Sequence, residues 1–132
     1  MIEKEILSLI DKCMENMDNA YAKYSNFNVS ALVIDEKERI FKGVNVENAS
    51  YGLSICAERN AIFSAVTNGM KKLKVICVIG NTNEPISPCG ACRQVIKEFA
   101  TSDTLIILSN IKKEYKVFTI EELLPYGFYY KV

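Results

Sequence analysis

The stretch LKVICVIGN, residues 73–81, decides the fold, because it holds the longest continuous apolar run in a chain of 132 residues. Its apolar side chains follow one another with little alternation, which predicts a strand buried on both faces in the middle of a sheet. The run is far shorter than the roughly 20 apolar residues that cross a bilayer. We therefore expect a buried central strand and no membrane segment.

Helices and strands are predicted on both sides of this strand. Upstream, apolar residues at spacings of three and four predict an amphipathic helix over 2–21, along Ile6, Ile10, Cys13, Met17 and Tyr21. A hairpin and a second helix follow, over 28–35, 39–48 and 54–70. Downstream, we expect a helix, a strand, a shorter edge strand and a last helix, over 89–100, 104–110, 114–119 and 119–125. This order predicts one domain over residues 1–132, a three-layer α-β-α fold with a central mixed sheet of about five strands.

Composition narrows the class of protein. Lys plus Arg and Asp plus Glu are 16 each, so no basic stripe for a nucleic-acid polymer is expected. The start, MIEKEILSLI, lacks a cationic segment before a long apolar core, so it does not resemble a signal peptide. The five cysteines are an odd number, which disfavours a disulfide scaffold. We expect a cytoplasmic protein with metal-binding or catalytic thiols.

The chain has no histidine. This absence excludes a Ser-His-Asp triad, a Cys-His pair and an H-E-x-x-H zinc site within the chain. Catalysis near pH 7 would therefore depend on a carboxylate, a lysine, a cysteine or a metal.

Cys89 and Cys92, in SPCGACRQV (87–95), lie three apart where a helix is expected to begin. The pair alone fits an unbound core pair, a redox dithiol, a structural metal knuckle or half of a catalytic metal site. A third cysteine, Cys56 in CAER (56–59), also lies near a helix start, where thiolates are favoured. If the two helix starts meet, the three thiolates would hold zinc and leave one tetrahedral position open, as catalytic zinc sites do.

Charged neighbours accompany both cysteine segments. Glu58 could carry protons at a water bound to the metal, or it could merely serve the helix dipole. Three thiolates around a zinc ion leave a net negative charge, and Arg59 and Arg93 could compensate for it by hydrogen bonds to sulfur, unless they are solvated surface residues. The two remaining cysteines, Cys13 and Cys77, are predicted to pack in the core.

CAE (56–58) followed by PCGAC (88–92) resembles the cytidine deaminase family of zinc hydrolases. The similarity extends, in family order, to YSNFNVSALV (24–33), GVNVENASYG (43–52), ICAERNAIF (55–63) and EELLPYGF (121–128). A cysteine at position 56, where deaminases of nucleic acids and tRNA carry histidine, indicates the branch that acts on free nucleosides.

The resemblance implies a role for each matching residue. Zinc, one ion per chain, would be held by Cys56, Cys89 and Cys92, and it would activate water for attack at C4 of cytosine in cytidine or deoxycytidine. Glu58 would carry protons to N3 and to the leaving amine. Substrate contacts are implied for the ribose-binding pair Asn45 and Glu47, for the aromatic Phe27, and for the backbone groups that read the base edge, the Ala57 N–H and the Ser87 carbonyl. On residue patterns alone, Asn45 and Glu47 could equally be turn residues, and Phe27 could be a core residue.

Assembly is also implied by the resemblance. Small chains of the family form homotetramers, and the phenylalanine matching Phe128 reaches into a neighbouring subunit's site. The aromatic C-terminal run LLPYGFYYKV could instead fold back on its own core. One departure from the family is Ser30, where glycine is usual; we expect its hydroxymethyl group to lie near Phe27 and to alter the packing behind the ribose.

Three rival functions remain open. A structural zinc module would need a fourth thiolate, from Cys13 or Cys77. A thiol oxidoreductase would need an exposed dithiol without metal. A deaminase of the antibiotic blasticidin S would share the metal motifs but lack the NVEN run (45–48), whose presence favours a ribonucleoside in pyrimidine salvage.

Overall fold

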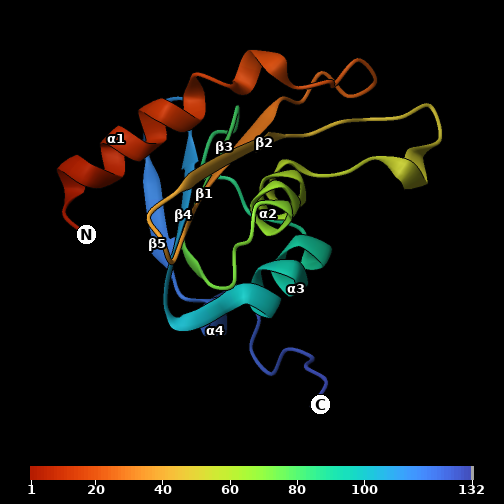
Figure 1. Cartoon of the computed structure of the whole chain (residues 1–132). Coiled ribbons are helices and arrows are strands. Elements are labelled where there is room, and N and C mark those ends of the chain that lie inside the picture. Colours follow the sequence, from red (N-terminus) through yellow and green to blue (C-terminus); the bar gives the residue numbers. More distant parts are fainter. Residues whose placement is uncertain (132) are drawn as a thin grey trace.

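The computed structural model describes residues 1–131, which form a five-stranded sheet with helices against both faces (Figure 1). The elements in chain order are α1 (Glu3–Met14), β1 (Val29–Asp35), β2 (Ile40–Val44), α2 (Ala57–Thr67), β3 (Leu73–Gly80), α3 (Gly90–Phe99), β4 (Ala100–Asn110), β5 (Tyr115–Phe118) and α4 (Ile120–Leu123). Within the described part of the chain, no helix combines the length and apolar character that a membrane span requires.

The apolar strand β3 lies at the centre of the sheet, in the order β2-β1-β3-β4-β5. It pairs antiparallel with β1 and parallel with β4, while β2 and β5 pair antiparallel at the two edges. The parallel pair is joined through α3, as a parallel connection requires a crossover. The predictions of a buried central strand and of a mixed sheet with an edge strand near 114–119 are confirmed.

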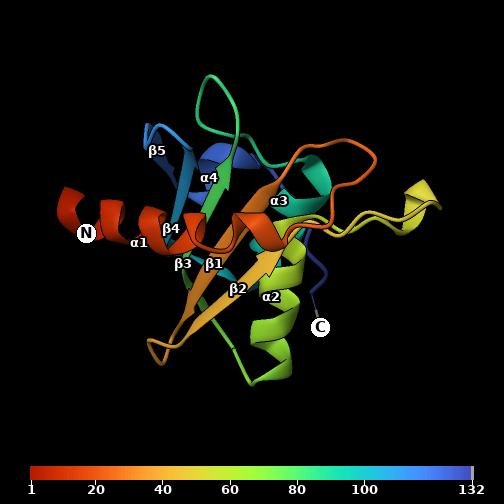
Figure 2. The ribbon, with the colours of Figure 1, turned by 90° about the horizontal axis from the view of Figure 1, so that it is seen from above.

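Two apolar cores lie on the two faces of the sheet, because alternate residues of each strand point to opposite sides. Leu32, Cys77 and Ile107 face α1, whereas Ile76 and Val78 face the other helices. Figure 2 shows α1 crossing one face, with α2 and α3 on the opposite side. The three-layer prediction is confirmed.

The first helix is shorter than predicted. It ends at Met14 instead of continuing to Tyr21, and a 3-10 turn over Met17–Asn19 follows. Asparagine and aspartate side chains compete with helical hydrogen bonds, and here the Asn19 side chain donates to that of Asn16 at 2.7 Å. Tyr21 is exposed and forms a β-bridge with Val46, so its predicted place on the helix is wrong.

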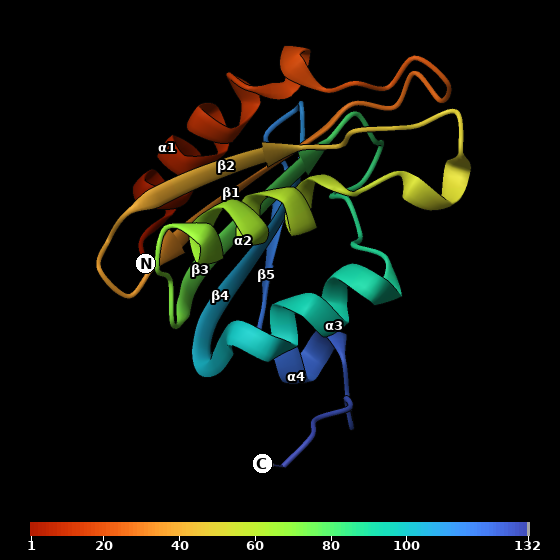
Figure 3. The same ribbon diagram turned by 45° about the vertical axis from the view of Figure 1, so that its right-hand side comes forward.

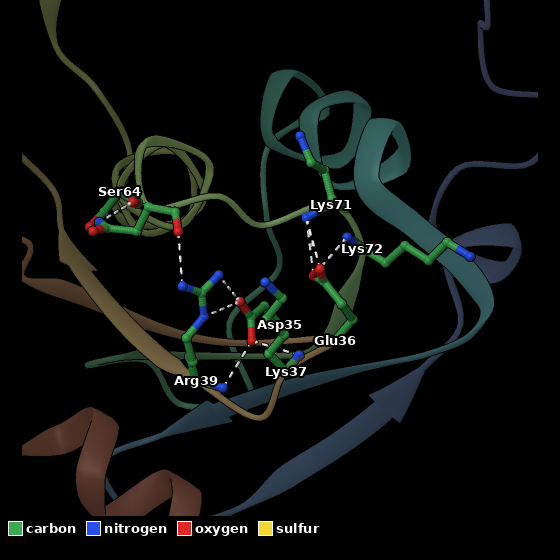
Figure 4. Close-up of polar contacts among 8 residues, drawn as sticks. Asp35, Glu36, Lys37, Arg39, Ser64, Lys71 and Lys72 are labelled. Carbon is green, nitrogen blue, oxygen red and sulfur yellow. Dashed lines mark hydrogen bonds and ion pairs between the residues drawn. The ribbon is translucent and has the colours of Figure 1, made fainter.

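Arg39 forms an ion pair with the buried Asp35 within the β1–β2 turn and a hydrogen bond to the residue that follows α2 (Figure 4). The Asp35 carboxylate accepts from the backbone N–H groups of Lys37 and Arg39 and from Arg39 Nε, at 2.8–3.0 Å. Arg39 Nη1 donates to the Asn68 carbonyl at 2.9 Å, just after α2. Burial alone would raise the pKa of Asp35, but the hydrogen bonds and the charge of Arg39 outweigh it and the pKa is lowered. This contact lies at the C-terminal end of α2, and the N-terminal end of the same helix carries Cys56.

Candidate metal centre and active site

Three cysteines meet where α2 and α3 begin. Cys56 is the N-cap of α2, Cys89 is the N-cap of α3, and Cys92 lies in the first turn of α3. Figure 3 shows the two helices side by side, both beginning at the same end of the sheet. The three sulfur atoms lie within 4.8 Å of one another, and the Cys56 and Cys89 sulfurs are 3.9 Å apart. The predicted meeting of two helix starts is confirmed.

The spacing of the sulfur atoms fits a zinc ion. Two thiolates at about 2.3 Å from a tetrahedral zinc lie about 3.8 Å apart, close to the 3.9 Å between Cys56 and Cys89. Three such ligands hold one zinc per chain and leave a fourth position open. Cys13 and Cys77 lie in the core on the opposite face of the sheet. They cannot supply a fourth thiolate, so the structural zinc module is excluded.

Hydrogen bonds favour the ionised form of Cys56. They lower the pKa of its thiol to about 5, chiefly through the Cys92 thiol and also through the Arg59 guanidinium. The same contact with Cys56, together with burial, raises the pKa of Cys92. Arg59 Nη2 donates to the Cys56 sulfur at 3.4 Å, so the predicted contact of this arginine with a ligand sulfur is confirmed.

Arg93 differs from Arg59. Its guanidinium donates to the Pro88 carbonyl at 2.9 Å, to the Leu123 carbonyl at 2.7 Å and to the Ser87 hydroxyl at 2.6 Å. The side chain turns back along the loop that precedes α3, and its donors are used by oxygen atoms. The prediction that Arg93 bonds a thiolate is therefore wrong.

A cavity of about 190 Å³ opens beside the sulfur cluster. Most of the predicted site residues meet there, on a wall formed by Phe27, Val29, Asn45, Cys56, Ala57, Glu58, Ile86, Ser87 and Cys89. Glu58 is buried, and the burial raises the pKa of its carboxyl group. A carboxyl group of raised pKa beside a metal site is suited to accept and return protons. Val29 and Ile86 were not predicted, because nothing in the sequence separates them from ordinary core residues.

Asn45 and Glu47 both turn toward the loop that carries Phe27. The Asn45 side chain accepts from the Val29 N–H at 2.9 Å and donates to the Phe27 carbonyl at 2.7 Å. The Glu47 carboxylate accepts from the Ser25 N–H at 3.1 Å and from the Ser25 hydroxyl. Ser25 lowers the pKa of Glu47 through that hydroxyl. Both residues lie beyond the end of β2, and their side chains bond neighbouring residues of the same loop.

Glu47 lines a second hollow and not the cavity beside the sulfur cluster. This hollow, of about 370 Å³, is formed with Tyr24, Ser25, Asn48, Tyr51 and Ser54. The hydroxyl of Ser25 also accepts from the Phe27 N–H at 3.0 Å, so it links the carboxylate to the aromatic residue. The sequence analysis missed Ser25, although a serine two residues before Phe27, in position for an ST-turn, was a usable signal.

Phe128 does not reach the cavity of its own chain. It is 70% exposed, beside Tyr126 and Tyr129 in a separate hollow near Lys97. Its backbone carbonyl accepts from the Gln94 side chain at 2.8 Å, which holds the C-terminal segment against α3.

The expectation for Ser30 is wrong. Its side chain is fully buried on the α1 face of the sheet, where its hydroxyl lies 3.6 Å from the Cys13 sulfur. Strand alternation explains the difference, because the neighbouring Val29, not Ser30, points toward the cavity.

Comparison with known proteins identifies the family. Residues 3–108 match the family described as the cytidine and deoxycytidylate deaminase zinc-binding region. Cytidine deaminase from Halalkalibacterium halodurans is 41% identical over 120 residues, which are 91% of each chain. The crystal structure of cytidine deaminase from Burkholderia pseudomallei superposes with a TM-score of 0.89 and 42% identity, over 97% of this chain and 100% of that one. Blasticidin-S deaminase from Bacillus cereus is 30% identical, and the match covers 94% of this chain and 92% of that one. This chain therefore belongs to the cytidine deaminase family of zinc-dependent hydrolytic enzymes.

Proposed function

We propose that this chain deaminates cytidine and deoxycytidine by hydrolysis, giving uridine or deoxyuridine and ammonia in pyrimidine salvage. The observation that carries the proposal is the shared cavity of Cys56, Cys89 and Glu58. It brings a zinc site with an open position next to a buried carboxyl group, and hydrolytic deamination needs both.

Glu58 performs the proton transfers in this reaction. Cys56, Cys89 and Cys92 would hold zinc, which would activate a water for attack at C4 of the cytosine ring. Glu58 accepts a proton from this water and delivers it to N3. It then takes the remaining proton from the new hydroxyl at C4 and delivers it to the amino group, which leaves as ammonia while the C4 carbonyl of uridine forms. In a chain without histidine, one carboxylate makes every transfer, and its raised pKa lets it hold each proton in turn.

The substrate is held by residues around the same cavity and by Glu47, which lines the second hollow. Asn45 and Glu47 bind the ribose, Phe27 packs beside the nucleoside, and the Ala57 N–H and the Ser87 carbonyl contact the base edge. Asn45 supports this assignment, because an amide can form four hydrogen bonds and its side chain forms only two with the described part of the chain. Arg59 offsets the charge of the thiolates.

Subunits complete one another's sites in a homotetramer. The exposed aromatic side chains of Tyr126, Phe128, Tyr129 and Tyr130 support this assembly, because monomers seldom expose so large an apolar patch. Light scattering should give about four times the chain mass of 14.9 kDa. Phe128→Ala should raise KM for cytidine; a fully active monomer would contradict the assembly and leave the zinc chemistry in place.

An absorbance assay with a zinc determination tests the activity directly. Purified protein should hold one zinc per chain and should remove the absorbance of cytidine and deoxycytidine. Blasticidin S is the comparison substrate, given the Bacillus cereus relative. Turnover of blasticidin S alone, or zinc-free protein with full activity, would overturn the proposal. Because its thiols are needed free for zinc, we also propose that the chain works as one domain in the reducing cytoplasm.

A further inference from the structure

The Ser87–Pro88 peptide at the edge of the cavity lacks one of the groups that usually fix a peptide's orientation, because proline has no N–H. Ser87 lines the cavity, and Pro88 is buried. The carbonyl of Ser87 belongs to this peptide. Its direction therefore depends on what holds the groups on either side of it.

One guanidinium holds both of those groups. Arg93 Nη2 donates to the Ser87 hydroxyl at 2.6 Å, and Arg93 Nε donates to the Pro88 carbonyl at 2.9 Å. The third donor, Nη1, bonds the Leu123 carbonyl at 2.7 Å, at the end of α4. Guanidinium donors point in fixed directions within one plane. The bond to α4 therefore anchors the plane, and the plane fixes the serine hydroxyl and the proline carbonyl relative to each other.

Within the described residues, the guanidinium of Arg93 bonds only these three oxygen atoms. Among residues 1–131, the ion pairs are formed by other residues, and Arg93 has no carboxylate partner. Its hydrogen bonds also go to oxygen and not to the metal-binding sulfurs. A residue of this kind should influence the direction of the loop without influencing zinc.

We propose that Arg93 is a positioning residue that aims the Ser87 carbonyl into the cavity, where this carbonyl accepts a hydrogen bond from the 4-amino group of the substrate. The inference rests on the proposed function, since it needs a substrate with an amino group at that position. It assigns base recognition, and not charge compensation at the metal, as the task of this arginine.

Kinetics with cytidine and its product separates the two tasks. Uridine carries an oxygen at C4 and cannot donate to the Ser87 carbonyl, so its binding should not depend on how that carbonyl is aimed. In Arg93→Gln, zinc should stay at one per chain, kcat/KM for cytidine should fall about tenfold, the equivalent of one hydrogen bond, and Ki for uridine should stay unchanged. In Arg93→Lys, kcat/KM for cytidine should lie between the values of the unsubstituted chain and Arg93→Gln. The lysine ammonium is a single point charge and cannot replace the planar guanidinium.

Two further variants test the contact with Ser87 separately and control for the loss of a positive charge. Ser87→Ala removes one acceptor of the guanidinium and keeps the Ser87 carbonyl. It should lower kcat/KM for cytidine and change Ki for uridine less. The loss of kcat/KM should be smaller than that in Arg93→Gln. Lys112→Gln removes an exposed cation in the β4–β5 turn and should behave as the unchanged chain does.

Several outcomes would overturn the proposal. These are an unchanged kcat/KM in Arg93→Gln, an equal loss for cytidine and uridine, or loss of zinc. If Arg93→Gln fails to fold, Ser87→Ala decides. The inference is rejected if, in Ser87→Ala, kcat/KM for cytidine relative to Ki for uridine equals that of the unsubstituted chain. Failure of the proposed function is seen separately, because the unchanged chain would then not deaminate cytidine at all.

Discussion

The five cysteines form two groups on opposite faces of the sheet. Cys56, Cys89 and Cys92 lie at two helix starts beside a cavity, whereas Cys13 and Cys77 lie in the core between α1 and the sheet. The first group has the buried carboxyl group of Glu58 beside it. In the second group, the Cys13 thiol lies 3.6 Å from the hydroxyl of the buried Ser30 and 3.5 Å from the Cys77 carbonyl.

The difference lies in the backbone around each thiol, since the side chain is the same. A helix N-terminus offers free N–H groups and a partial positive charge to a thiolate, as the Cys92 N–H does to the Cys89 sulfur at 3.4 Å. Cys77 sits in mid-strand and Cys13 near the end of α1, and both side chains are fully buried. One group is therefore built for metal and the other for packing.

Cys89→Ala should have the largest effect that this comparison predicts. It removes a ligand, so zinc should be lost, and with it both the activity and part of the folding free energy, because metal binding is coupled to folding. Zinc determination, the cytidine assay and denaturant unfolding measure the three losses.

Cys77→Ala is the matched control on the other face. It should keep zinc and activity and lose about 1–2 kcal/mol of unfolding free energy, the cost of a small cavity in the core. If this variant emptied the metal site, the division into two groups would be wrong.

Glu58→Gln should show that the carboxyl group serves the chemistry and not the metal. Glutamine keeps the size of the side chain but cannot carry protons, so turnover should fall about a thousandfold, within the usual range for general acid–base catalysis. Zinc should remain at one per chain. A variant that kept a tenth of the activity would show that another group moves the protons.

Thiol labelling of the zinc-free chain should distinguish the two groups by rate. A pKa of about 5 leaves Cys56 almost fully ionised at pH 6 to 8, so its alkylation rate should be nearly constant there. An ordinary thiol, of pKa about 8.5, should react about tenfold faster per pH unit. Cys13 and Cys77 are fully buried and should react only on unfolding. Mass mapping identifies the labelled residue, and early labelling of Cys77 would contradict the comparison.

Sequence patterns predicted the architecture and most of the site. The apolar run at 73–81 and the turn signals around it gave the sheet, and the spacing of the three cysteines gave the metal site. The failures occurred where a three-dimensional neighbour decides the result. Nothing near Arg93 in sequence reveals that the Leu123 carbonyl, thirty residues away, takes up one of its donors. The polar segment around Asn16 and Asn19, which ends α1, was outweighed by the apolar spacing that continues to Tyr21.

Ser30→Ala should have the smallest effect, and it tests the boundary between the two faces. The substitution removes the hydroxyl that the Cys13 thiol meets at 3.6 Å, and it keeps the Cβ that fills the α1 face. A weak hydrogen bond of this kind contributes no more than about 1 kcal/mol to the free energy of unfolding. The hydroxyl lies across the sheet from Glu58 and the sulfur cluster, so kcat/KM for cytidine and the zinc content should be unchanged. Denaturant unfolding and the cytidine assay on the same preparation measure both quantities. A tenfold loss of activity with unchanged stability would mean that the packing beneath α1 reaches the active site through β1, and that the two faces are not independent.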